Sequence, residues 1–218
     1  MWAILNSPLL IGADLRTLEP SALTILNNPA IIAVNQDPLA KSAIRIYRNT
    51  NVAKDEYDMG EIQIWSGKLF GGDQVVAFLN AADEDVEMKA TLKEIFIREA
   101  GKAPQVEEYW SVYDLWADRM DDTLASSVLQ AKDGQKSSLL REAGWYNATE
   151  MPYDIGIKKG DPRLLGKKVG SVEPRGVLKA IVKRHSVQVF RLRSPNKDVV
   201  IQDIPQDKLA EKYQHDDL

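Results

Sequence analysis

The hydrophobic pattern changes character near residue 39 of the chain. Before that point, residues 9–11 form a continuous apolar run that Gly12 ends, which is typical of a strand covered on both faces. A helix is predicted over residues 20–27, because proline suits a first helical turn and Pro29 cannot continue a helix. One strand and one helix cannot bury that strand, so the pattern indicates part of a parallel sheet or barrel. The alternative is a small helical cap on the rest of the chain.

Beyond residue 39 apolar and polar residues alternate, as in antiparallel strands. The predicted strands cover residues 44–48, 61–65, 74–80, 86–92, 166–172, 177–182 and 186–193. The first three are predicted to form a meander, and the last two a hairpin that turns near residues 183–185. In a short turn over residues 93–96, Ile95 and Phe96 are expected to fill the core.

Aromatic residues are concentrated at 106–116, around Trp110 and Trp116. Large aromatic side chains dominate the cores of packed sheets, so we predict that both indoles lie between two sheets. The alternative is that they form an aromatic platform for a sugar ring.

The segment 118–176 is polar and irregular, and because long structureless loops are uncommon we expect short strands within it. Residues 128–129 and 139–140 flank Asp133-Gly134 and are predicted to form a hairpin. The tail, 195–218, is polar except for Val199–Ile201, which is a candidate edge strand. We expect the rest of the tail to be solvated and frayed or partly helical.

Composition narrows the class of protein. The 218 residues carry a net charge of −4, are 44% hydrophobic and 28% charged, and include no cysteine. Disulfides and thiol chemistry are therefore excluded, and no basic excess marks a nucleic-acid or membrane-surface partner. No apolar run approaches the length of a membrane span, and no signal-peptide features precede Trp2. The oligomeric state stays open.

The residues that carry a family resemblance lie in the first 39 positions. They are Trp2-Ala3, Ser7-Pro8-Leu9-Leu10-Ile11-Gly12-Ala13-Asp14-Leu15, Leu26 and Ile32-Ala33-Val34-Asn35-Gln36-Asp37-Pro38-Leu39. This string resembles the end of the catalytic barrel in melibiase-type (glycoside hydrolase family 27) α-galactosidases, and a looser similarity to the fungal members continues to about Arg193. The resemblance implies a mostly β chain: the last β/α unit of a (β/α)8 barrel (1–39, with its strand at 8–15), an antiparallel β-sandwich (40–194) and a polar tail (195–218).

The resemblance also implies retaining hydrolysis of terminal α-linked galactose from oligosaccharides. That chemistry needs two carboxyl groups about 5–5.5 Å apart. In the resembled family the nucleophilic aspartate closes a Lys-Tyr-Asp motif on the fourth barrel strand, and the acid/base follows the sixth; neither strand is encoded here. The Tyr-Asp pairs at 57–58, 113–114 and 153–154 are predicted to be ordinary loop or edge residues. We therefore predict no catalytic residue in this chain and no hydrolysis by it alone.

Asp14 is the one acid at the appropriate end of the implied barrel strand. It is the candidate substrate-binding residue, on the rim of the active-site face; the alternative is that its carboxylate caps the following turn, a common role of Asp. Asp37 and Ser66 are predicted to be turn residues. The two histidines, His185 in a turn and His215 in the tail, show no metal-ligand spacing, and no metal or cofactor is implied.

Asn147-Ala148-Thr149 satisfies the N-glycosylation rule in a polar loop. Together with the resemblance to secreted fungal enzymes, it predicts a secreted glycoprotein. Three functions are compatible with the sequence: the C-terminal portion of an α-galactosidase acting on α-galactoside oligosaccharides, a non-catalytic β-sandwich module that binds carbohydrate or stabilises a partner, and a subunit that completes another chain's barrel.

Overall fold

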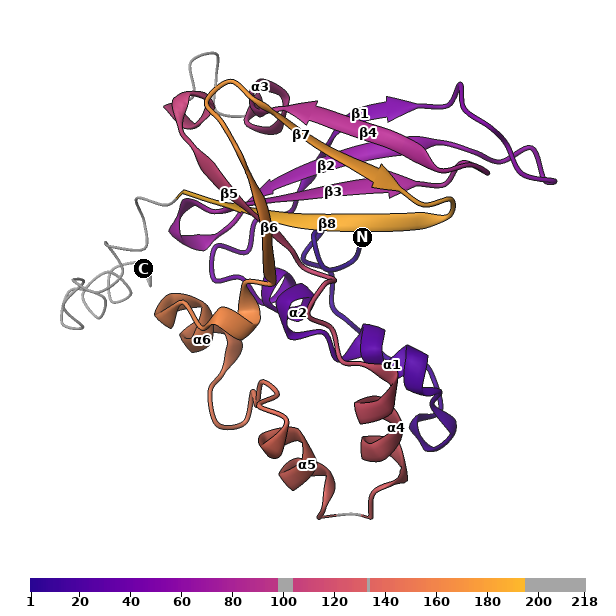
Figure 1. The fold of residues 1–218 in the computed structure, drawn as a ribbon, viewed down its shortest axis with the longest axis vertical. Coiled ribbons are helices and arrows are strands. Elements are labelled where there is room, and N and C mark those ends of the chain that lie inside the picture. The colour runs from indigo at the N-terminus through magenta and orange to yellow at the C-terminus, as the bar shows by residue number, and fades with distance from the viewer. Residues whose placement is uncertain (98–103, 133, 195–218) are drawn as a thin grey trace, which may run out of the picture.

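The computed structural model describes residues 1–97, 104–132 and 134–194. A β-sandwich occupies one end of the molecule and most of the helices gather at the other (Figure 1). The strands are β1 (Ile44–Asn49), β2 (Ile62–Lys68), β3 (Gln74–Asn80), β4 (Val86–Thr91), β5 (Trp110–Asp114), β6 (Lys167–Val172), β7 (Val177–Val182) and β8 (Ser186–Arg193). The helices are α1 (Pro20–Leu26), α2 (Pro29–Asn35), α3 (Leu92–Ile95), α4 (Asp122–Gln130), α5 (Lys136–Glu142) and α6 (Tyr153–Lys159). Short 3-10 turns are η1 (Leu15–Thr17), η2 (Phe70–Gly72), η4 (Pro104–Glu107) and η5 (Pro162–Leu164).

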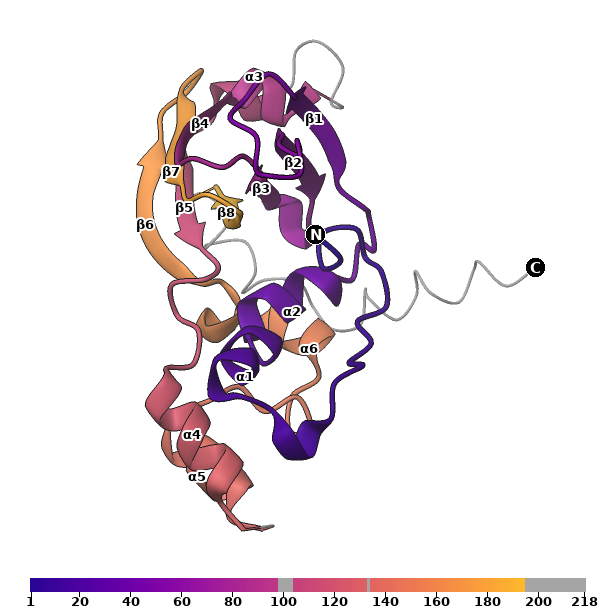
Figure 2. The ribbon, with the colours of Figure 1, turned by 90° about the vertical axis from the view of Figure 1, so that its right-hand side faces the viewer.

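The sandwich consists of two antiparallel sheets of unequal size. Six strands form one sheet in the order β1-β2-β3-β8-β5-β6, and β4 pairs with β7 in the other. Figure 2 shows β4 and β7 beside the larger sheet, with α3 at the end of the sandwich away from the other helices. The predicted β1-β2-β3 meander is confirmed by its continuous antiparallel register.

The principal core lies between the two sheets. Phe78 and Trp110 are fully buried there, with Met88 of β4 and Leu178 of β7 facing them from the smaller sheet. Ile95 and Phe96 are also buried, so the prediction that this short turn fills the core is confirmed. A reciprocal hydrogen-bonded cap between Thr91 and Glu94 fixes that turn.

The predicted hairpin of residues 177–182 with 186–193 is wrong. The two strands are consecutive, but β7 pairs with β4 whereas β8 pairs with β3 and β5. The chain crosses between sheets at residues 183–185, where the buried amide of Asn80 donates to the carbonyls of Val182 and Lys183. The backbone N–H of Arg184 donates to Asp85. These long-range bonds satisfy the backbone groups that a hairpin would have paired internally.

A second core covers the other face of the six-stranded sheet. Val75 and Ala77 of β3 and Val189 of β8 pack there against Ala30 and Val34 of α2. Both faces of β3 are therefore buried, which agrees with its nearly continuous apolar run.

The segment 118–176 is mainly helical up to residue 164, so the expectation of short strands is wrong there. The predicted hairpin of 128–129 with 139–140 is replaced by α4 and α5, which lie side by side in both ribbon views (Figures 1 and 2). The side chain of Asp121 caps α4 by accepting from Leu124 N–H. Ala125 and Val128 are the buried positions of α4, and their spacing is helical rather than alternating.

The N-terminal segment contains the predicted helix and one helix that was not predicted. The first helix, α1, ends at Leu26, before the predicted stop at Pro29. Pro29 then begins α2, because Asn28 caps it by accepting from Ile31 N–H while donating to the Leu115 carbonyl. The strand implied at 8–15 is not formed: residues 8–12 are irregular, η1 begins at Leu15, and none of the strands in the described part of the chain pairs with this segment.

The division of the chain at residue 39 stays a prediction, and the described residues on either side of it share the second core. The predicted tail, with the candidate strand at 199–201, lies outside the described residues. No helix in the described part of the chain combines the length and apolar character that crossing a membrane needs.

Candidate functional site

Asp14, the candidate substrate-binding residue, lies in an exposed turn at the start of η1. Its carboxylate accepts from the backbone N–H of Arg16 at 3.0 Å and from the Arg16 guanidinium at 2.9 and 2.8 Å. Hydrogen bonding to the Arg16 side chain lowers the pKa of Asp14. The carboxylate is thus ionised and committed to its own turn, which is the capping geometry; contact with a sugar stays a prediction.

The extended segment before Asp14 presents apolar side chains to solvent. Leu9, Leu10 and Ile11 are 40%, 80% and 54% exposed. They border a concavity of about 640 Å³ whose other walls include Trp2 and Ile25. Exposed apolar patches of this kind are typical of interaction surfaces and ligand-binding grooves.

Asp37 does more than form the predicted turn. Its side chain is buried, and it accepts from the backbone N–H groups of Leu39 and Phe70 at 3.0 and 2.9 Å. The bond from Phe70 joins the loop that follows α2 to η2, which connects β2 and β3. Burial raises the pKa of Asp37, although those two hydrogen bonds and the nearby Arg191 oppose the rise.

A buried ion cluster lies beside Asp37. Asp73 accepts from Arg191 Nη1 at 3.1 Å, and Nη1 of Arg193 lies 3.9 Å from the same oxygen. The side chains of Asp73 and Arg191 are only 6% and 2% exposed. Both arginines share a face of β8 with Val189, because alternate residues of a strand point to the same side, and α2 packs on that face.

The two candidate tryptophans have different environments. Trp110 is fully buried in the principal core and stacks on Phe96 with ring centroids 5.0 Å apart, so the prediction that it is a core residue is confirmed. Trp116 is half-buried and packs against the second core, on the helical side of the large sheet. It therefore does not lie between the two sheets.

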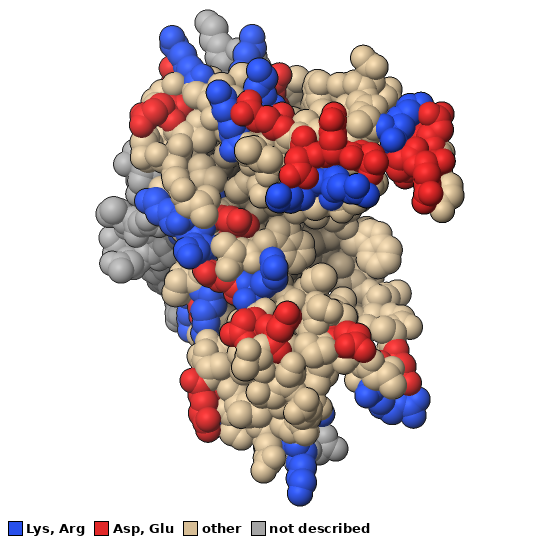
Figure 3. Space-filling model, turned by 45° about the vertical axis from the view of Figure 1, so that its right-hand side comes forward, with Lys and Arg blue, Asp and Glu red and all other residues tan. Residues whose placement is uncertain are grey.

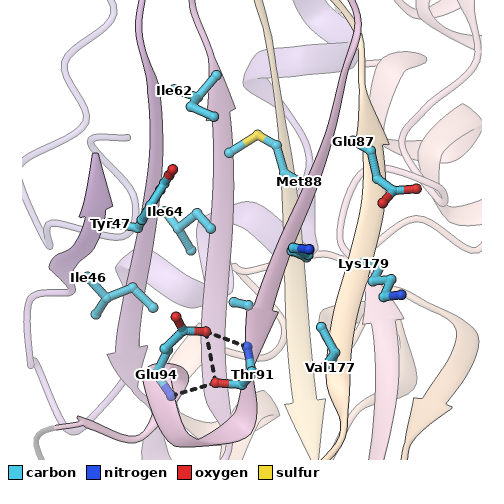
Figure 4. Close-up of a pocket in the computed structure, with 12 residues that line it drawn as sticks. Ile46, Tyr47, Ile62, Ile64, Glu87, Met88, Thr91, Glu94, Val177 and Lys179 are labelled. Carbon is cyan, nitrogen blue, oxygen red and sulfur yellow. Dashed lines mark hydrogen bonds between the residues drawn. The ribbon is translucent and has the colours of Figure 1, made fainter. Parts of the chain in front are cut away.

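A groove of about 430 Å³ runs between β1 and β4 (Figure 4). Its floor is aliphatic, made by Ile46, Ile62, Ile64 and Met88. The carboxylate of Glu94 is occupied by the cap on Thr91, as the dashed lines in the figure show. The groove thus combines an aliphatic floor with the polar side chains of Tyr47, Glu87, Lys89 and Lys179.

The Tyr-Asp pairs lie apart from one another. Residues 57–58 are in an exposed loop, as predicted, whereas residues 153–154 begin α6. Tyr113 and Asp114 belong to β5, which pairs on both sides with β6 and β8. The prediction of a loop or edge position is therefore wrong for the β5 pair, because β6 covers that edge.

Ser66 and His185 are two further polar residues that the sequence predicts to lie in turns. Ser66 is not in a turn: it is buried in β2 and donates to the Ile95 carbonyl. His185 is in the predicted turn, with Nε2 3.2 Å from an Asp83 oxygen, whereas His215 lies outside the described residues. Within the described ranges, no three His, Asp or Glu side chains gather as metal ligands.

Asn147 is exposed in the loop between α5 and α6. Its side-chain oxygen accepts from the backbone N–H of Thr149 at 3.0 Å, which closes a local turn over the whole glycosylation sequon. Modification at this position is untested and stays a prediction.

Two family models match the chain. Residues 1–37 match the α-galactosidase A family, and residues 59–135 match the α-galactosidase C-terminal β-sandwich domain.

The described surface is mixed in charge, with acidic and basic side chains interspersed on the face in Figure 3.

The curated proteins that are similar in sequence support these family matches. An α-galactosidase of Torulaspora delbrueckii is 42% identical over 193 residues, and α-galactosidase 2 of Saccharomyces cerevisiae is 43% identical over 193 residues. Each alignment covers 88% of this chain and 40% of the relative. The chain therefore spans about 40% of the length of the curated relatives it matches.

Solved structures show the same relationship. An α-galactosidase of Saccharomyces cerevisiae superposes with a TM-score of 0.81 at 40% identity, covering 88% of this chain and 41% of that one. The structure of α-galactosidase I from Mortierella vinacea, at 23% identity and a TM-score of 0.57, shares the fold over 88% of this chain and 33% of its own. By sequence and fold, this chain belongs to the melibiase-type (glycoside hydrolase family 27) α-galactosidases and corresponds to their C-terminal part.

Proposed function

We propose that these residues serve as the C-terminal portion of a retaining α-galactosidase that removes terminal α-linked galactose from oligosaccharides. The observation that carries the proposal is the exposed segment 9–11. It is apolar and exposed, and no described strand pairs with it, as expected of a barrel strand separated from its neighbours. A relative solved with raffinose supports this substrate class.

The two catalytic carboxylates are proposed to lie outside these 218 residues. Retaining hydrolysis needs a nucleophile and an acid/base about 5–5.5 Å apart, projecting from the C-terminal ends of barrel strands. The described strands all belong to the two antiparallel sheets. Asp14, on the rim of the barrel's active-site face, would orient a loop or a sugar hydroxyl and would not react itself.

Complementation tests this proposal. The chain alone should show no turnover of raffinose or of a chromogenic α-galactoside. Co-expression with the barrel portion of a yeast relative, ending just before the residue that matches Met1, should restore turnover. A matched partner in which the motif Asp is changed to Asn should restore binding of the two pieces without activity. Turnover by the chain alone, well above a blank, would contradict the assignment of the carboxylates.

A second candidate function is stabilisation of a partner chain, and the 640 Å³ apolar concavity favours it. In that case the partner supplies the remaining β/α units and gains stability without needing hydrolysis. Complementation distinguishes the two: a stable complex that remains inactive even with an intact Lys-Tyr-Asp partner supports this candidate alone.

Secretion and glycosylation at Asn147 form a further part of the proposal. The exposed sequon and the similarity to yeast enzymes support it. Expression in yeast behind a secretion leader should give a product whose mass falls on endoglycosidase treatment. Asn147→Gln should abolish that fall, whereas the control Asn51→Gln should not; an unmodified wild-type product would contradict the prediction.

A further inference from the structure

A cleft of about 680 Å³ lies at the place where β5 ends beside β8. It lies between α1, the segment that follows β5, and the beginning of β8. Trp116, Arg119 and Asp122 line it from one side, with Thr24 of α1 and Gln188 of β8 opposite. Ile25 and Trp116 also line the 640 Å³ concavity, whereas the polar residues Asp114, Arg119 and Asp122 line only this cleft.

The polar side chains of the cleft have hydrogen-bonding capacity left over. The Asp114 carboxylate uses Oδ1 to accept from Trp116 N–H at 2.8 Å, which leaves Oδ2 without a partner among the described residues. Within the same ranges, the side chains of Arg119, Asp122 and Gln188 form no ion pair or hydrogen bond. The cleft therefore presents both free acceptors and free donors.

The apolar part of the cleft is equally specific. Trp116 lines it, but its indole Nε1 is buried and has no partner within the described residues. The surface that Trp116 offers is consequently ring carbon. Ile25 of α1, which is 55% exposed, adds a second apolar contact at the same place.

This combination selects a neutral polyhydroxylated ligand. Two carboxylates and one guanidinium leave the lining with a net negative charge, which disfavours an anion. Each sugar hydroxyl both donates and accepts, and the C–H face of a sugar ring packs against an aromatic ring; a few polar groups around an apolar wall are the usual anatomy of a ligand pocket. The groove of Figure 4 differs in its aliphatic floor, although Tyr47, Glu87 and Lys179 also line it.

We infer that the cleft beside Trp116 is a carbohydrate-binding site that operates without the catalytic barrel. Asp114, Asp122 and Arg119 hydrogen-bond the sugar hydroxyls, and Trp116 carries a ring face. The inference goes beyond the proposed hydrolase role, because every lining residue belongs to this chain.

Titration of the isotopically labelled 218-residue chain with raffinose, followed by two-dimensional NMR, tests the site. Saturable shift changes are expected at the backbone amides of Ala117, Arg119 and Gln188. Asp122→Asn should weaken raffinose binding about tenfold, because it replaces a charge-assisted hydrogen bond by a weaker neutral one. The matched control is Asp118→Asn, an exposed neighbouring carboxylate that does not line the cleft and should leave the affinity unchanged.

Glucuronate, an anionic sugar, should bind more weakly than raffinose. Absence of saturable shifts, or shifts centred on Tyr47 of the aliphatic groove, would overturn the inference; so would equal losses in Asp122→Asn and Asp118→Asn. This test is independent of the complementation experiment. If hydrolysis is restored but raffinose causes no shifts, only the inference about this cleft is contradicted. If raffinose causes shifts but hydrolysis is not restored, only the hydrolase proposal is contradicted.

Discussion

Similar apolar residues are buried in the sandwich but exposed in the N-terminal segment. In the sandwich, Leu192 on β8 is fully buried between the two sheets. In the N-terminal segment, Leu10 is 80% exposed beside a concavity with no strand over it. The sandwich encloses its own core, whereas the N-terminal segment is buried mainly through α2, which packs on the sheet and against the helical layer around Tyr146 and Leu164. The difference shows that one chain can carry a self-sufficient layer and a fragment of a larger one.

The joint between the two regions should give the largest effect. Asp73→Ala leaves the Arg191 guanidinium buried without its carboxylate, so the free energy of unfolding should fall by about 3–5 kcal/mol. Urea denaturation followed by tryptophan fluorescence measures the change. In the double variant Asp73→Ala/Arg191→Met much of the loss should return, because the Arg191 guanidinium is then no longer buried without its carboxylate. A double variant as unstable as the single one would show that the Asp73–Arg191 pair is not the cause.

The two leucines test the comparison directly. Leu192→Ala removes side-chain contacts from a filled core and should cost about 2–5 kcal/mol. The same substitution at Leu10 should change the free energy of unfolding by less than about 0.5 kcal/mol, as expected of an exposed site. Equal losses at the two positions, measured by urea denaturation, would mean that segment 9–11 is covered in solution.

A pair of glycines sharpens the description of the helical layer. Gly156 lies in α6, where helix propensity alone favours alanine by about 1 kcal/mol. An added Cβ would fall on the hydroxyl of Tyr146 and lie 2.8 Å from Leu164 Cδ1, so Gly156→Ala should instead lower stability by about 1–3 kcal/mol. Gly170→Ala on β6, where a Cβ meets nothing within 4 Å, is the control that should have little effect. Thermal unfolding of both variants checks this, and a stabilised Gly156→Ala would contradict the packing.

The smallest effect is expected in the pH dependence of stability. Because burial raises the pKa of Asp37 in the folded state, the folded protein binds this proton more tightly than the unfolded chain. The resulting stabilisation is fully present below the unfolded pKa, about 3.8–3.9, and is lost as pH rises through the raised folded value. Asp37→Asn should flatten this part of the stability–pH curve, measured by urea denaturation at a series of pH values. Asp58→Asn, at an exposed loop position, should leave the curve unchanged.

Local sequence patterns were sufficient to predict strand pairing where residues close in sequence are also close in space. The meander of β1, β2 and β3 followed from alternation and turn residues, and the nearly continuous apolar run of β3 indicated its central place. The crossing from β7 to β8 could not be read in the same way, because Asn80 and Asp85 make its decisive bonds from about a hundred positions away. The helices α4 and α5 were missed because Val128 and Leu129 are residue types that suit a strand. The helical spacing of the buried residues of α4 becomes visible only when α4 packs against α1.

The sequence by itself determined the family and the predominance of antiparallel strands, since both depend on residue types in local order. Tertiary structure alone decided that Arg191 is buried, that Asp37 ties α2 to η2 and that Trp116 borders a polar cleft instead of the sandwich core. The physical reason is the same for all three. Alternation shows which residues share a face of a strand, but only the packed neighbours decide whether that face meets water, a second sheet or a helix.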